Sequence, residues 1–281
     1  MLMKKIFPRK QLDIINRVEK IMTWWIQQRQ SKLENELTDT MSINPFLLPF
    51  IAEYHFLSNL SELFNIIIAS HLITGHNTGF GKLVDEKILP EVFGTIKLTK
   101  KYRKENKPYI DSCFDEIDHI VTKPDGVIEL LSLKAGRWTI QLTMAVQLNH
   151  AFNEITTKYP NLFKTINVGV FYGLEKDLTD KYDILRGINR GAVHNVIDLK
   201  KKVFIHAGSD FWSWINNGET ETQDWVLSGI LKALKKSRIR DKNKELFSSF
   251  ERAVFNKFQT RSHKKFTKQD WFTLLQKISG N

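Results

Sequence analysis

Two apolar segments joined by a tight turn limit the fold of this chain more than any other feature. The segments Cys113–Val121 and Val127–Leu133 are rich in Ile, Val, Leu and Phe, and Pro124-Asp125-Gly126 lies between them. Pro-Asp-Gly favours a sharp reversal of the chain, and apolar β-branched segments on both sides of such a turn are typical of strands. The sequence therefore predicts a β-hairpin, which requires a sheet.

Helical patterns surround this hairpin. Apolar residues at spacings of three and four predict long helices over 9–37 and 58–72, the second capped by Ser58 or Asn59. Further helices are expected over 81–93, 139–158 and from 211 to the end, and further strands over 166–172, 196–199 and 203–206. This order predicts an α/β or α+β fold, a mixed β-sheet core flanked by helices with additional N- and C-terminal helices.

The charge balance favours a polyanionic partner. Forty-two Lys and Arg residues against 31 Asp and Glu give a net charge of +11. Basic side chains that neutralise phosphates release condensed counterions, which favours binding to nucleic acid. A basic surface without such a partner is the alternative. A basic run that is suited to phosphate contacts comprises Lys97, Lys100, Lys101, Arg103 and Lys104.

Cysteine usage and hydropathy indicate a cytoplasmic protein without a membrane partner. Cys113 is the only cysteine, which excludes an internal disulfide and a Cys-rich zinc site. The first 15 residues lack the apolar stretch of a secretory signal, and the apolar residues around 46–50 are too few to cross a bilayer.

The predicted hairpin carries charged side chains in a pattern that suits phosphodiester hydrolysis. Asp118 lies in the first strand, and Ser132 and Lys134 lie on one face of the second. A carboxylate is a ligand that Mg²⁺ prefers, and a nearby ammonium stabilises negative charge developing on a phosphate. Solvent-facing edge residues that guard the sheet against aggregation are the alternative interpretation.

Eight sequence blocks carry a resemblance to a known family: Met41–Phe46, Thr74–His76, Thr78–Leu83, Phe114–His119, Glu129–Gly136, Gly169–Gly173, Leu185–Asn189 and Phe211–Trp214. They resemble the type II restriction endonucleases of the RGGNCCY-cutting family, over roughly residues 20 to 250. The hairpin and its following helix resemble the PD-(D/E)xK nuclease core, in a variant with Ser at the middle acidic position. The resemblance implies a restriction-endonuclease-like core over 73–210, between a helical region, 1–72, that is a candidate for dimerisation and a C-terminal helical region, 211–281.

The resemblance also implies activity and site residues. It implies Mg²⁺-dependent cleavage of both strands of double-stranded DNA by a homodimer. Asp118 would ligate the metal and Lys134 would orient the attacking water and the phosphate. Ser132 departs from the family pattern and leaves the site one carboxylate short, for which Glu86 or Glu116 is expected to compensate.

Several residues are candidates for DNA contacts. A segment that mixes hydrogen-bond donors with glycines contains Arg186, Asn189, Arg190, His194 and Asn195, and Arg and Asn side chains can read guanine and adenine. An ordinary surface loop is the alternative for this segment. Arg137 is expected to contact the same phosphate as Lys134. The segment Thr78–Lys82 lacks the residues of a phosphate-binding P-loop, so we expect a DNA-backbone contact or a turn there.

Two other functions remain open. A repair or recombination nuclease on the same core would cut particular DNA structures rather than sequences. A DNA-binding protein with a degenerate nuclease core would explain the missing middle acid.

Overall fold

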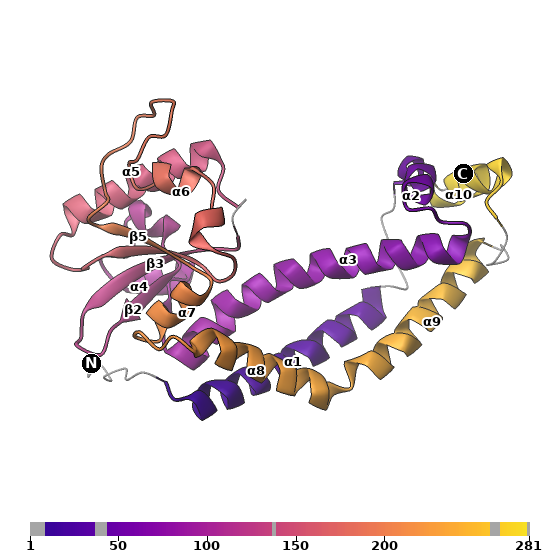
Figure 1. The fold of residues 1–281 in the computed structure, drawn as a ribbon, viewed down its shortest axis with the longest axis horizontal. Helices are drawn as coiled ribbons and strands as arrows, with labels where there is room; N and C mark the ends of the chain where they lie inside the picture. Colours follow the sequence, from indigo (N-terminus) through magenta and orange to yellow (C-terminus); the bar gives the residue numbers. More distant parts are fainter. Residues whose placement is uncertain (1–8, 37–43, 137–138, 259–264, 280–281) are drawn as a thin grey trace. The chain divides into compact units, whose positions relative to one another are not determined.

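The computed structural model describes residues 9–36, 44–136, 139–258 and 265–279. The chain divides into two compact units, each built from separate stretches of sequence (Figure 1). Unit 1 comprises residues 1–21 and 81–232, and unit 2 comprises residues 22–80 and 233–281. These units do not coincide with the expected regions 1–72, 73–210 and 211–281. Each unit joins segments that are distant in sequence, which local periodicity does not reveal.

Unit 1 contains a five-stranded mixed sheet, so the expected α+β class is confirmed. Its order is β1-β2-β3-β4-β5, in which β1, β2 and β3 pair antiparallel and β3, β4 and β5 pair parallel. The strands are β1 (Ile96–Lys97), β2 (His119–Thr122), β3 (Ile128–Lys134), β4 (Ile166–Val170) and β5 (Val203–Ala207). The expected strand over 196–199 is absent, because that stretch is irregular.

The β2–β3 hairpin forms around the expected turn. The Lys123 N–H donates to Val127 O at 2.8 Å, and Gly126 takes a positive φ of 84° that favours glycine. The first strand is shorter than expected, because Ser112–Glu116 forms a 3₁₀-helix, η3. Cys113, Phe114 and Ile117 are buried, whereas Asp115 is exposed. Burial at these positions fits a helical turn and does not fit the strict two-residue alternation of a strand.

Helices cover both faces of this sheet. On one face, α5 (Leu142–Lys158) packs through Leu148 and Phe152 against Val168 of β4 and other core residues. On the other, α7 (Ser209–Ile215) lies so close that a Cβ added to Gly169 would be 2.5 Å from the Phe211 ring. The site therefore rests on a sheet that is packed on two sides.

Unit 1 also includes the beginning of α1 (Gln11–Glu36) and most of α8 (Thr222–Ser237). The Arg9 N–H donates to Asn216 Oδ1 at 2.7 Å, and a Cβ on Gly229 would lie 2.7 Å from Val18 Cβ. The remaining short helices of this unit are α4 (Lys100–Glu105), η4 (Glu175–Asp177) and α6 (Lys181–Ile184).

Helix α3 (Leu60–Leu83) is longer than the sequence suggested. Its expected cap is confirmed, since Asn59 Oδ1 accepts from the Glu62 N–H at 3.0 Å. The helix continues through Thr78–Lys82, so the expected turn there is wrong, whereas the DNA-backbone contact stays a prediction. Gly75 lies against Arg29 of α1, where an added Cβ would be 2.6 Å from the guanidinium, and an added Cβ on Gly79 would be 3.4 Å from the Trp25 ring. These two glycines therefore have a packing role. From Val84 to Val92 the chain forms a π-helix, η2.

Unit 2 has its own apolar core. Leu48, Leu63 and Phe64 pack with Leu274 of α10 (Lys268–Ser279). Trp25 of α1 packs within unit 2 against Phe80 and His76. The other elements of unit 2 are η1 (Pro45–Leu47), α2 (Leu48–Tyr54) and α9 (Ile239–Phe258).

Candidate active site

The carboxylate of Asp118 lies against the backbone of β3. The Asp118 N–H donates to Leu131 O at 2.9 Å, and Asp118 Oδ2 accepts from the Leu133 N–H at 2.7 Å. Leu133 stands between Ser132 and Lys134, so the structure brings the acid to the part of β3 that carries both. The hairpin thus assembles the expected group of residues at one place.

The environment of Asp118 disfavours its charge. Burial raises the pKa of the Asp118 carboxyl above its ordinary value of 3.8, and the negative charge of Asp85 adds to this rise. The Leu133 N–H and the positive charges of Lys134 and His119 lower the pKa in turn. A buried carboxylate that interacts with several charges is typical of a functional site.

Ser132 and Lys134 share a face of β3 but differ in exposure. Ser132 is fully buried, and its hydroxyl has no hydrogen-bond partner in the described structure. Lys134 is half-buried, and its ammonium forms no hydrogen bond or ion pair with another described residue. The hydroxyl therefore lacks a polar partner, and the ammonium is available to an anion.

A chain of polar contacts that the sequence did not predict lies beside Asp118. His119 is fully buried, its Nδ1 lies 3.0 Å from Thr95 Oγ1, and its Nε2 lies 2.8 Å from Asp85 Oδ1. Asp85 Oδ2 accepts a hydrogen bond from Lys97. Burial alone would raise the Asp85 pKa, but the hydrogen bonds from His119 and Lys97 outweigh it and hold that pKa below 3.8.

The two acids expected to compensate for Ser132 differ from Asp118 in their surroundings. Glu86 is exposed, and Asp85, one residue earlier in η2, is the acid whose charge reaches Asp118. Residues advance through a smaller angle per position in a π-helix than in an α-helix, so the facing residue changes. Glu116 is the last residue of the 3₁₀-helix η3 and does not lie in a strand.

The expected base-reading segment is a loop held from within. It belongs to the connection between α6 and β5, which projects past α5 in Figure 1. Asn189 Oδ1 accepts from the His194 N–H at 3.0 Å, and His150 Nε2 lies 2.9 Å from Asn195 O. Arg190 pairs with Asp183 at 2.6 Å. Several hydrogen-bonding and charged groups of this loop are therefore already paired within the protein.

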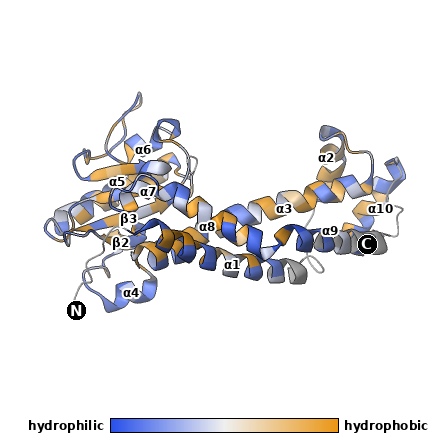
Figure 2. Cartoon of the chain, turned by 60° about the horizontal axis from the view of Figure 1, so that its bottom comes forward, coloured by the Kyte–Doolittle hydropathy of each residue, from blue (hydrophilic) through white to orange (hydrophobic). Residues whose placement is uncertain are grey.

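The other candidate DNA contacts have different surroundings. Arg186 is half-buried with an unpartnered Nε, and Lys82 is exposed at the end of α3. Arg137 lies outside the described residues. In the basic run, Lys97 binds Asp85 and Arg103 binds Asp115, whereas the lysines of α4 are exposed on a helix that Figure 2 shows as hydrophilic. The basic members left for phosphate contacts are Lys100, Lys101 and Lys104.

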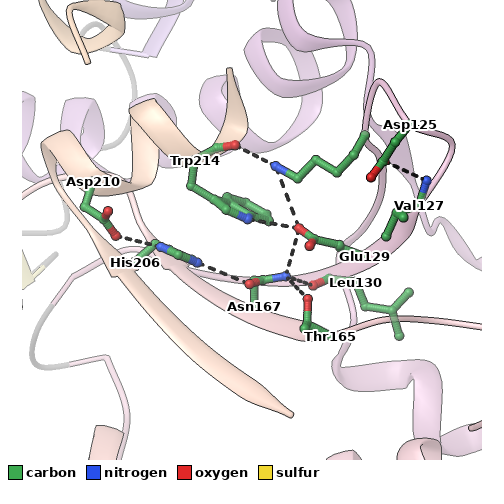
Figure 3. Close-up of polar contacts among 10 residues, drawn as sticks. Asp125, Val127, Glu129, Leu130, Thr165, Asn167, His206, Asp210 and Trp214 are labelled. Carbon is green, nitrogen blue, oxygen red and sulfur yellow. Dashed lines mark hydrogen bonds and ion pairs between the residues drawn. The ribbon is translucent and has the colours of Figure 1, made fainter. Parts of the chain in front are cut away.

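A second polar network covers the α7 face of the sheet (Figure 3). Glu129 Oε2 accepts from Trp214 Nε1 at 3.0 Å, and the ammonium of Lys123 lies 4.4 Å from the Trp214 ring centroid. His206 stacks on the same indole at 4.9 Å and lies 3.2 Å from Asn167 Oδ1. These contacts join the hairpin turn to β4, β5 and α7, which stabilises the base of the candidate site.

A third cluster offers metal ligands but suits an ion poorly. Ligand atoms of Asp111, Cys113 and Glu154 lie within 4.8 Å of one another. Lys158 already pairs with both carboxylates, at 3.1 and 2.5 Å. Burial and the charges of Asp111 and Glu154 raise the pKa of the Cys113 thiol to about 12, which disfavours the thiolate that a metal requires.

No protein-family model matches this chain, and no curated protein sequence matches it significantly. Within the described residues, no helix combines the length and apolar character needed to cross a membrane.

Proposed function

We propose that this chain is a Mg²⁺-dependent type II restriction endonuclease that cleaves both strands of double-stranded DNA at RGGNCCY or a related GC-rich site. One observation carries the proposal: Asp118 is anchored at the Leu133 N–H, between Ser132 and Lys134, within the electrostatic reach of Lys134. Metal-assisted phosphodiester hydrolysis needs a carboxylate and an ammonium, which Asp118, directly before β2, and Lys134, at the end of β3, supply.

The residues present are compatible with Mg²⁺. This ion commonly takes one or two protein carboxylates and completes its shell with water and phosphate oxygens. Asp118 would hold it, and the unpartnered hydroxyl of Ser132 leaves a polar group near Asp118 for water or substrate. A bound Mg²⁺ would lower the pKa of the attacking water and offset charge on the phosphate.

Lys134 would act on the substrate directly. Its ammonium is half-buried, so less water screens its charge than at an exposed position. It would bind an oxygen of the scissile phosphate and orient the attacking water, while the Leu133 N–H holds Asp118 in place.

DNA binding and assembly follow from surface features. The exposed lysines of α4, the arginines of the α6–β5 loop and Lys82 supply phosphate contacts, in keeping with the net charge of +11. Cleavage of both strands requires two hairpins, and a homodimer supplies them. Unit 2 exposes Phe46, Phe50 and Phe56 to 76, 64 and 92%, which supports a protein-contact surface there.

The test is digestion of genomic DNA with the purified protein and Mg²⁺, followed by sequencing of the fragment ends. We expect ends at one short sequence. We also expect Lys134→Ala to lower cleavage by at least about 100-fold while DNA binding persists. Cutting confined to particular DNA structures would instead indicate a repair or recombination nuclease. Absence of cleavage on varied DNA would indicate a non-catalytic DNA-binding protein.

A further inference from the structure

The chain just beyond Lys134 passes unusually close to a tyrosine. A Cβ added to Gly136 would lie 2.2 Å from the Tyr172 hydroxyl oxygen and 2.8 Å from Cζ. A side chain at position 136 would therefore displace the phenol. The absence of a side chain lets the Tyr172 hydroxyl rest directly against the backbone that follows Lys134.

Strand register brings Tyr172 to the end of the sheet that carries Lys134. Lys134 pairs with Val170 in the parallel ladder between β3 and β4. Gly136 follows Lys134 by two residues and Tyr172 follows Val170 by two residues, and these two residues lie next to each other. The Tyr172 hydroxyl therefore lies just past the carboxyl ends of β3 and β4, close to the strand end that carries Lys134.

Two tyrosines at Gly136 differ in their availability. Tyr182 is buried, and its hydroxyl donates to Gly136 O at 2.8 Å, so it is committed to holding the backbone. Tyr172 is 55% exposed, and its hydroxyl has no hydrogen-bond partner among the described residues. An exposed phenol donor and an unpaired ammonium therefore both lie at the carboxyl ends of the adjacent parallel strands β3 and β4.

We propose that Tyr172 contacts the DNA backbone and donates a hydrogen bond from its hydroxyl to a phosphate oxygen next to the one that Lys134 binds. This inference rests on the proposed function. Tyrosine hydroxyls are common phosphate donors, and such contacts position the duplex without reading its sequence. Tyr172 thereby sets the register of the scissile phosphate relative to Asp118 and Lys134.

A purely structural role makes different predictions. The Tyr172 ring packs edge-on against Phe171 at 5.3 Å and covers Gly136. If packing is its only role, Tyr172→Phe behaves as the wild type and only Tyr172→Ala is impaired. If the hydroxyl binds phosphate, both variants are impaired.

The experiment measures affinity for a fluorescent 30-base-pair duplex, without divalent cation, over a series of salt concentrations. We expect Tyr172→Phe to weaken binding roughly 10-fold, because a hydrogen bond to a charged oxygen is lost. The slope of log affinity against log salt should stay unchanged, because a neutral phenol releases no counterion, whereas Lys134→Ala should reduce it by about one. Tyr54→Phe is the matched control, since Tyr54 is an exposed tyrosine of unit 2.

The outcomes separate this inference from the proposed function. Wild-type affinity of Tyr172→Phe, or an altered salt slope, overturns the phosphate contact even if the protein cleaves DNA. A protein that never cleaves DNA but binds it more weakly as Tyr172→Phe retains the contact and loses the nuclease assignment. A protein that binds no DNA overturns both.

Discussion

The side chain of Asn149 hydrogen-bonds both backbone polar groups of Ile197. Its Oδ1 accepts from the Ile197 N–H at 2.8 Å, and its Nδ2 donates to Ile197 O at 2.8 Å and to Leu185 O at 3.1 Å. Asn149 is fully buried in α5, whereas residues 185 and 197 stand at the two ends of the α6–β5 loop. One amide therefore closes the loop that contains the candidate base-reading residues.

Replacing Asn149 with Leu should release this loop. The variant keeps the number and branching of the side-chain heavy atoms but leaves buried backbone groups unpaired, which should lower the free energy of unfolding by about 1–3 kcal/mol. Hydrogen exchange at the Ile197 amide should accelerate, while exchange in β3 should change little. Unchanged exchange at Ile197 would contradict the assigned role.

Two neighbouring acids of η2 should respond differently to loss of charge. Asp85→Asn removes the charge that pairs with buried His119 and with Lys97, and we expect a loss of about 1–3 kcal/mol in the free energy of unfolding. Glu86→Gln should change it by less than about 0.5 kcal/mol, because Glu86 is exposed. Urea denaturation measures both, and equal effects would argue against this orientation of η2.

Gly169 should tolerate no added methyl group. A Cβ there would lie 2.5 Å from the Phe211 ring and 2.8 Å from Leu131 Cδ1, and we expect Gly169→Ala to cost about 1–3 kcal/mol. Gly81 is the control, because nothing lies within 4 Å of its added Cβ and it lies within α3. Gly81→Ala should stabilise the protein by about 0.4–1 kcal/mol. Thermal unfolding distinguishes the two.

Cys113 should resist alkylation until the protein unfolds. The residue is 3% exposed, and burial, with the charges of Asp111 and Glu154, raises the pKa of its thiol to about 12. At pH 8 very little thiolate is present, so iodoacetamide should label the native protein slowly and the urea-unfolded protein rapidly. Mass spectrometry gives a clean result, because the chain has one cysteine. Rapid native labelling would contradict the burial.

Asp111 should contribute stability that depends on pH. Its carboxylate accepts hydrogen bonds from Lys158 and from the Tyr159 hydroxyl, and these hold the pKa of Asp111 below its ordinary value of 3.8. A carboxyl whose folded-state pKa is depressed stabilises the fold above its unfolded pKa and loses that contribution as pH falls through the folded value. The stability difference between wild type and Asp111→Asn should therefore be constant near neutral pH and shrink below pH 3.8.

Local patterns predicted the elements whose signals are local. The Pro-Asp-Gly turn, the cap at Asn59 and the long helix α1 all formed as the sequence indicated. The same reasoning failed where packing decides the conformation. Residues 112–116 form a 3₁₀-helix that places Cys113 and Phe114 in the core, and Gly75 and Gly79 of α3 serve close packing against α1.

The residues of the candidate site also divide into those that local sequence patterns predict and those that only packing brings together. Asp118, Ser132 and Lys134 were predicted because one hairpin carries all of them. The contacts of Asp85 with His119 and Lys97 were not predicted. They depend on which residues the π-helix η2 turns toward the sheet and on the two-residue strand β1, which carries Lys97. Tyr172 was also missed, since its approach to Gly136 depends on strand register.

The buried position of Leu274 has a consequence for biosynthesis. This residue of α10 completes an apolar core whose other buried members lie between residues 48 and 72, some 200 positions earlier. While the ribosome adds the intervening chain, those apolar side chains can pack on one another but lack Leu274, so part of their apolar surface stays exposed until α10 is made. Unit 1 has its whole sheet translated by residue 207, so it can mature first.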